Sequence, residues 1–133
     1  MRFSRKIDYG LIFLEVLSRA YKRNAVVTVR GVSEKYGVPY SFLEKVALDL
    51  RMAGIIVSKK GKGGGYVLAR SPKRITMREM FSALEQPKMM RCLESGKAEG
   101  SCLLLAVCPT RKRWQVLDKK ILEVLRKTTL AEI

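Results

Sequence analysis

This chain of 133 residues contains no histidine. The absence excludes imidazole as a metal ligand and removes every catalytic arrangement in which a histidine is the general base. No other paired nucleophile and base stands out along the sequence, so an enzyme is the poorest fit to it. We therefore expect a binding protein that has no small-molecule substrate.

Long apolar runs are missing as well. Residues 103–107 (Leu-Leu-Leu-Ala-Val) are far too few to cross a bilayer, which takes about 20 apolar residues. The N-terminal residues 1–6 lack the apolar stretch that a signal peptide carries after its positive charges. We expect a cytoplasmic protein that has no membrane partner.

Acidic residues are scarce. The chain has 12 of them against 27 lysines and arginines, which gives a formal net charge of +15. A surplus of this size on one small domain indicates a polyanionic partner. Because the basic residues are spread along a chain rich in apolar residues, we expect the charge to decorate a folded surface. Charge alone does not separate DNA from RNA, so a basic RNA-binding protein remains an alternative.

Apolar residues recur at helical spacing in several segments of the chain. They predict helices over about residues 4–21, 28–36, 40–52, 76–84 and 110–127. Gly37 and Pro39 make a tight break between the second and third helices. Thr76 and Glu79 have the spacing of a capping box. Residues 26–29 add a short extended piece before the second helix.

A glycine-rich basic stretch, residues 59–66, lies between two short β-branched runs. Two such runs around a glycine cluster predict a β-hairpin, because glycine enters turn conformations with positive φ without strain. The plain alternative is a solvated turn, and an ATP-binding loop is disfavoured because no Ser or Thr follows Gly61-Lys62. A hairpin that carries three lysines after a helix–turn–helix pattern is typical of a winged helix-turn-helix DNA-binding domain.

We therefore predict a mainly α-helical chain with a small β-hairpin. A winged helix-turn-helix domain is expected over residues 1–87, a cysteine-bearing loop over 88–109, and a long dimerisation helix with its tail over 110–133. The apolar residues of that helix follow the spacing of a helix–helix seam. They are Trp114, Leu117, Ile121 and Val124. We expect this seam to pair with a second copy in a homodimer, and packing on its own domain is the alternative.

The second helix of a helix-turn-helix lies in the major groove, where its N-terminal residues contact base edges. Glu44 can accept a hydrogen bond from a cytosine amino group, although a carboxylate there also favours the helix dipole. Wing lysines neutralise phosphates, and wing glycines allow close approach to the duplex. The predicted DNA-binding residues are Thr28, Tyr40, Ser41, Glu44, Lys45, Arg51, Lys60, Gly61, Lys62 and Gly63.

All three cysteines, Cys92, Cys102 and Cys108, fall within one segment that has no helical period. Their spacing lacks the close cysteine pair typical of zinc sites, and cytosolic proteins rarely carry a disulfide framework. Three thiolates from one loop with a fourth ligand from elsewhere suit an iron–sulfur cluster better than zinc. The alternative is three thiols that are redox-active or that act as small hydrophobic side chains.

Three motifs resemble the Rrf-two family of bacterial winged-helix regulators. They are residues 41–44 (Ser-Phe-Leu-Glu), 50–56 (Leu-Arg-Met-Ala-Gly-Ile-Ile) and 61–66 (Gly-Lys-Gly-Gly-Gly-Tyr). The likeness covers nearly the whole chain. It implies a homodimeric transcription regulator, a repressor, that binds a palindromic operator in double-stranded DNA. It also implies an iron–sulfur cluster on Cys92, Cys102 and Cys108, of the 4Fe–4S or 2Fe–2S type with the former slightly favoured.

The fourth ligand differs between branches of this family. In the IscR-like branch it is a histidine just after the third cysteine, and residues 109–111 here contain none. In the NsrR-like branch an aspartate near the start of the first helix reaches the partner subunit's cluster, and Asp8 stands at the matching position. Asp8 is thus the implied ligand, although a first-turn acid also favours the helix dipole or pairs with Arg5. Two departures are a longer gap between Cys92 and Cys102 and Lys62 in place of a common proline.

The resemblance also implies how such a protein senses its signal. A cluster held between two subunits would set operator affinity in response to nitric oxide, redox state or iron supply. The same dimer without a cluster, using its cysteines as redox thiols, is the alternative function.

Overall fold

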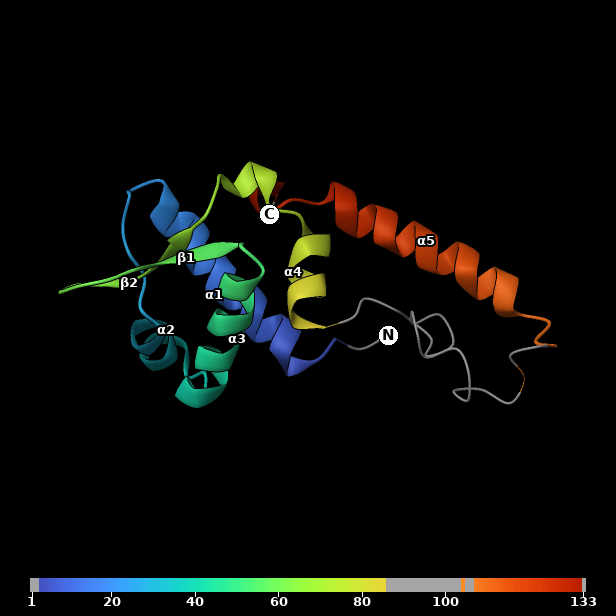
Figure 1. Cartoon of the computed structure of the whole chain (residues 1–133), viewed down its shortest axis with the longest axis horizontal. Coiled ribbons are helices and arrows are strands. Elements are labelled where there is room, and N and C mark those ends of the chain that lie inside the picture. Colours follow the sequence, from blue (N-terminus) through green and yellow to red (C-terminus); the bar gives the residue numbers. More distant parts are fainter. Residues whose placement is uncertain (1–2, 86–103, 105–106, 133) are drawn as a thin grey trace.

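Four helices and a β-hairpin surround the core. The last helix projects away from them and lies against them only near its C-terminal end (Figure 1). The computed structural model describes residues 3–85, 104 and 107–132. Its helices are α1 (Arg5–Tyr21), α2 (Val29–Tyr36), α3 (Tyr40–Met52), α4 (Met77–Leu84) and α5 (Arg111–Lys127). The strands are β1 (Ile56–Lys59) and β2 (Gly65–Leu68), and short 3-10 turns are formed by Pro72–Arg74 and Leu130–Glu132. The predicted mainly helical chain with one hairpin is confirmed.

The core joins α1, α3 and α4. Its most deeply buried large side chains include Phe13, Leu14, Leu17, Leu43, Val46, Leu50 and Met80. Each buried aliphatic or aromatic side chain of this kind contributes about 1.5–3 kcal/mol relative to an exposed one. Gly10 lets α1 and α4 approach closely, because a Cβ there would overlap the Cδ1 atom of Leu84.

Polar side chains cap the N-termini of the first, second and fourth helices. The Thr28 hydroxyl accepts from the backbone N–H of Gly31 at 2.9 Å and so caps α2. Thr76 and Glu79 form the predicted capping box at the start of α4. Gly37 ends α2 with a φ of +70°, a left-handed conformation that glycine adopts without strain. These local signals explain why the predicted helix ends agree with the structure to within a residue or two.

The hairpin is antiparallel, and its register pairs Ile56 with Leu68 and Lys59 with Gly65. Val27 extends it, because the backbones of Val27 and Tyr66 exchange two hydrogen bonds of 2.9 and 2.7 Å. The extended piece expected before α2 is therefore present at Val27. Close backbone approach explains Gly65, since a Cβ there would collide with the carbonyl oxygen of Val27.

The chain after α5 returns to the core. Leu130 is 1% exposed, and its backbone N–H donates to the Ile75 carbonyl at 2.8 Å. The Met77 N–H donates to the Thr128 carbonyl at 2.9 Å, so the end of α5 is fastened beside the start of α4. The opposite end of α5 extends past the other helices (Figure 1). Within the described ranges, no helix has both the length and the apolar character that a membrane span requires.

Candidate DNA-binding surface and cysteine segment

α3 turns one face to the core and the other to solvent. Leu43, Val46, Ala47 and Leu50 are buried, whereas Tyr40, Ser41, Glu44 and Lys45 are exposed. α2 packs against α3 in the manner of a helix-turn-helix. The predicted base-contacting residues therefore lie together on one accessible surface at the start of α3.

Two contacts with α1 hold α3 along the same flank. The Lys6 ammonium lies 2.7 Å from the Asp49 carboxylate, and the rings of Tyr9 and Phe42 meet edge to face with centroids 5.4 Å apart. Phe42 and Asp49 are seven residues apart, so they lie on one side of the helix. The exposed ion pair contributes about 0–1 kcal/mol, yet the two contacts together restrict rotation of α3 about its axis.

Arg30, which sequence reasoning did not select, lies beside the start of α3. Its guanidinium sits over the ring of Tyr40, 4.9 Å from the ring centroid. Both side chains are exposed, and a cation–π contact at such a site contributes about 0.5–1 kcal/mol. The contact places a permanent positive charge next to the predicted base-contacting residues. The only signal in the sequence was a basic residue two positions after the helix-capping Thr28.

Thr28 and Arg51 take different positions from the predicted base-contacting residues. The Thr28 oxygen serves α2 as a cap, and its hydroxyl hydrogen remains able to donate to a phosphate. Arg51 is exposed three turns into α3, and its contact with a phosphate stays a prediction.

The tip of the hairpin is fully accessible. Lys60, Gly61, Lys62 and Gly63 are all exposed, and the hairpin points away from the helices on the side opposite to α5 (Figure 1). Gly61 and Gly63 have φ values of +104° and +81°, which side chains other than glycine rarely adopt. The Gly64 N–H donates to the Gly61 carbonyl at 2.9 Å and closes the turn. The tip thus carries Lys60 and Lys62 on a tight, narrow loop.

Arg70 is one basic residue whose role is structural. It donates to the carbonyl oxygens of Arg74 and Gly54, at 3.0 and 3.3 Å, and it forms an ion pair with Glu79. These contacts join the end of β2, the turn after α3 and the start of α4. Arg70 therefore fixes the hairpin relative to α3, and part of the positive surplus serves the fold.

Of the predicted cluster ligands, the structure describes Cys108 and Asp8, whereas Cys92 and Cys102 lie outside the described residues. The Cys108 sulfur lies 3.4 Å from the Thr110 hydroxyl. Hydrogen bonds from the Thr110 side chain and backbone hold the pKa of the Cys108 thiol below its usual value, with help from Arg111. Asp8 is exposed in the first turn of α1, and Arg5 donates to the Tyr9 hydroxyl at 3.4 Å. Within the described ranges, no three potential metal ligands gather.

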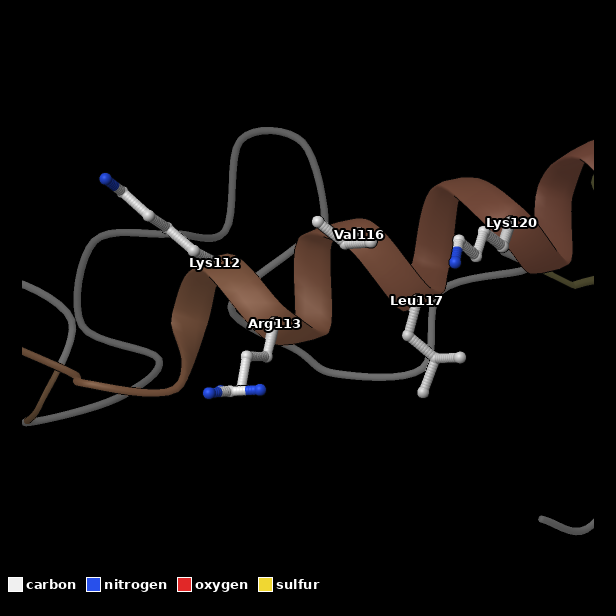
Figure 2. Close-up of a pocket in the computed structure, with 5 residues that line it drawn as sticks. All are labelled: Lys112, Arg113, Val116, Leu117 and Lys120. Carbon is white, nitrogen blue, oxygen red and sulfur yellow. The ribbon is translucent and has the colours of Figure 1, made fainter.

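The predicted seam on α5 is only partly covered. Trp114 and Ile121 are half-buried, whereas Leu117 and Val124 are 40% and 63% exposed. Val116 is also exposed, and it lines a shallow groove of about 360 Å³ with Leu117, Lys112, Arg113 and Lys120 (Figure 2). The N-terminal half of α5, residues 111–120, therefore presents an apolar strip flanked by positive charges.

Comparison with known proteins identifies the family. The profile of the Rrf2 family, described as "Iron-dependent Transcriptional regulator", matches residues 3–133. The chain belongs to the Rrf2 family. Among its relatives, the HTH-type transcriptional regulator IscR of Cereibacter sphaeroides is 30% identical over 134 residues, with 100% of this chain and 86% of that protein covered. The putative HTH-type transcriptional regulator ORF2 of Azotobacter vinelandii is 31% identical, with 100% and 79% covered.

Solved structures agree with this assignment. IscR of T. potens superposes with a TM-score of 0.77 at 28% identity and covers 99% of this chain and 85% of that one. CymR, described as the global cysteine regulator of B. subtilis, gives a TM-score of 0.77 at 27% identity, with 98% and 93% covered. The winged-helix fold and the family are thereby confirmed. This Rrf2-family protein is an IscR-like transcriptional regulator of the helix-turn-helix type, and its relatives are named as regulators rather than as enzymes.

Proposed function

We propose that this Rrf2-family regulator is a homodimeric repressor that binds a palindromic operator and that an iron–sulfur cluster controls its affinity. The observation that carries the proposal is the exposed surface at the start of α3, held in place by α1 and accompanied by a cationic hairpin tip. Such a surface matches the major groove of a duplex, whose base edges a helix can reach. A bacterial regulator of this kind acts in the cytoplasm.

Each part of the surface has a defined task on the duplex. Tyr40, Ser41, Glu44 and Lys45 face base edges, while Arg51 and Arg30 lie closer to phosphates. Lys60 and Lys62 approach the backbone beyond the groove, with the glycines of the turn allowing the contact. Charge neutralisation by these residues releases counterions, so we expect affinity to fall steeply with salt.

Dimerisation is supported by the exposed strip on α5. Leu117 and Val124 lie on the predicted seam and remain accessible in one chain. Pairing two copies of α5 would cover Leu117 and Val124. The dimer would then place two α3 helices, one from each subunit, on one operator. A symmetric dimer requires a symmetric site, which is why a palindrome is expected.

The donor set around Cys108 suits a cluster. A cluster ligand must be deprotonated, and the hydrogen bonds from Thr110 favour the thiolate of Cys108. The start of α1, which carries Asp8, and the start of α5 lie well apart in one chain (Figure 1). Cys92, Cys102 and Cys108 of one subunit would hold the cluster together with Asp8 of the other. The cluster, when bound, supplies chemistry that responds to nitric oxide, oxygen or iron supply, and its ligands tie two subunits together.

The first test is the content of iron and acid-labile sulfide in protein purified without oxygen, together with its visible spectrum. Asp8→Ala should bind iron less firmly, lose visible absorbance faster in air, and lose the dependence of operator affinity on the cluster. Glu34→Ala is the matched control, because Glu34 is an exposed acid on another helix. If Asp8→Ala kept a cluster as long as the control, with the same effect on DNA binding, the tether between subunits would be wrong.

A cluster-free regulator that uses redox thiols is the second candidate. The similarity to CymR, the "Global Cysteine Regulator" of B. subtilis, and to a structure titled the oxidized form of Staphylococcus aureus CymR favours it. The lowered pKa of Cys108 fits this chemistry too, because the thiolate is the reactive form. Colourless protein that resists cluster reconstitution, yet binds an operator with an affinity that peroxide changes and a thiol reductant restores, would favour this candidate.

A further inference from the structure

The outward line of α3 changes chemistry halfway along the helix. Ser41 and Lys45 occupy its first half, and Leu48 and Met52 its second half. The spacings of four, three and four residues place these side chains on one line, opposite the buried face of the helix. Leu48 is 47% exposed and Met52 79% exposed. An apolar side chain thus continues the line on which the predicted base-contacting residues lie.

The core does not account for Leu48. The half-buried apolar residues that pack against the core include Tyr9, Leu11 and Val16, and Leu48 is not one of them. The flank of α3 that contacts α1 carries Phe42 and Asp49. Leu48 lies between this flank and Glu44, which is one turn earlier on the helix. The Leu48 side chain therefore points to solvent on the same side of α3 as the exposed side chains of its first turns.

Leu48 and Met52 lie at different distances from Ser41 along the axis of α3. With a rise of about 1.5 Å per residue, Leu48 lies about 10 Å along the axis from Ser41, and Met52 about 16 Å. The major groove is about 12 Å wide. If α3 crosses this width starting at Ser41, Leu48 lies within reach of base edges, whereas Met52 lies past the edge of the groove.

We propose that Leu48 is a specificity residue that packs on the C5-methyl group of a thymine in the operator. The proposal rests on the proposed function, in which α3 lies in the major groove. The thymine methyl is the apolar group of a base pair in that groove, and apolar side chains recognise it by contact. Leu48 follows Glu44 by about 6 Å along the axis, the rise of about two base pairs of about 3.4 Å each. The thymine should lie about two base pairs from the position that Glu44 contacts.

The test removes the methyl group and the leucine in turn. Operators are first selected by wild-type protein from random duplexes, and each thymine of one half-site is then replaced by deoxyuridine, which lacks only that methyl. Dissociation constants are measured by fluorescence anisotropy. One replacement should weaken wild-type binding about fourfold, as expected for one buried methyl group. Leu48→Ala should bind the unmodified operator more weakly and show no further loss with the same replacement.

Met52→Ala is the matched control. It removes an exposed apolar side chain one turn further along the same line, and it should bind both duplexes as the wild type does. Both substitutions exchange an exposed residue for a good helix former, so neither should impair folding.

Failure of this inference and failure of the proposed function would give different results. If the wild type selects an operator and no replacement weakens its binding, Leu48 does not read a thymine. The same conclusion follows if Leu48→Ala keeps the deoxyuridine penalty. If the wild type prefers no duplex over another, the proposed function fails and the inference with it.

Discussion

The body formed by α1 to α4 and helix α5 differ in how far their apolar residues are buried. The body buries Phe13, Leu14, Leu43 and Leu50 completely within its own chain. Along α5, which is described throughout, the one buried residue is Asp118, while Val116, Leu117 and Val124 remain exposed. The core of the body is completed by Leu130, which follows α5, and by Leu125 packed against it, whereas Val116, Leu117 and Val124 stay accessible in one chain. We therefore expect the body to recognise DNA and α5 to mediate assembly.

The largest expected effect tests assembly. Leu117→Lys should raise the dissociation constant of the dimer about 100-fold, equivalent to about 2.8 kcal/mol, by burying a charge beside other positive charges. Those neighbours are Lys112, Arg113 and Lys120 (Figure 2). Sedimentation equilibrium over a range of protein concentrations gives the constant.

Val57→Lys is the control for that substitution. Val57 is 41% exposed, close to the 40% of Leu117, but it lies on the hairpin. Its variant should dimerise as the wild type does. Equal effects of the two substitutions would remove the distinction between the body and α5.

Local signals made much of the fold predictable from the sequence. Thr28 and Thr76 cap helices through neighbours three residues away, and Gly37 ends α2 by its own conformation. The predicted base-contacting residues followed from helix periodicity alone, and their exposure agrees with it. Their contact with DNA stays a prediction, as do the cluster ligands.

Contacts between distant segments were not predictable in the same way. Arg70 reaches the Gly54 carbonyl 16 residues away, and Arg30 stacks on Tyr40 across the turn between two helices. The sequence shows the charge of these two arginines but not which groups their side chains contact. Both arginines add to the same positive surplus, although one holds the fold together and the other faces the solvent beside α3.

A smaller effect should separate two lysines of equal charge. Lys62→Ala, on the hairpin tip, should weaken binding to all duplexes by about fivefold at 0.15 M salt if Lys62 neutralises one phosphate. The slope of log affinity against log salt should fall by about 0.9 for each phosphate that the variant leaves without a cation. Lys119→Ala is the control, because Lys119 is an exposed lysine on α5. If both variants lowered the slope equally, the positive surplus would act as a diffuse field and the hairpin would have no special part.

The smallest effect concerns the threonines at helix starts. Thr76 accepts from a backbone N–H of α4, whereas Thr110, just before α5, makes no such cap and instead contacts the Cys108 sulfur. Thr76→Val should therefore cost about 1 kcal/mol of unfolding free energy, and Thr110→Val much less. Thr110→Val should instead raise the pKa of the Cys108 thiol toward its usual 9.0, because it removes the largest cause of the lowering.

The lowered pKa of the Cys108 thiol fixes the direction in which its contribution to folding stability changes with pH. The folded thiol loses its proton at lower pH than the unfolded one, so the thiolate stabilises the folded state fully above pH 9.0 and not at all below the folded pKa. The rate of alkylation by iodoacetamide, measured against pH in a Cys92→Ser, Cys102→Ser background, reports that pKa. Thr110→Val should shift the profile to higher pH. An unshifted profile would mean that the backbone of residues 110–111, rather than the hydroxyl, favours the thiolate, and that the start of α5 prepares Cys108 through its main chain alone.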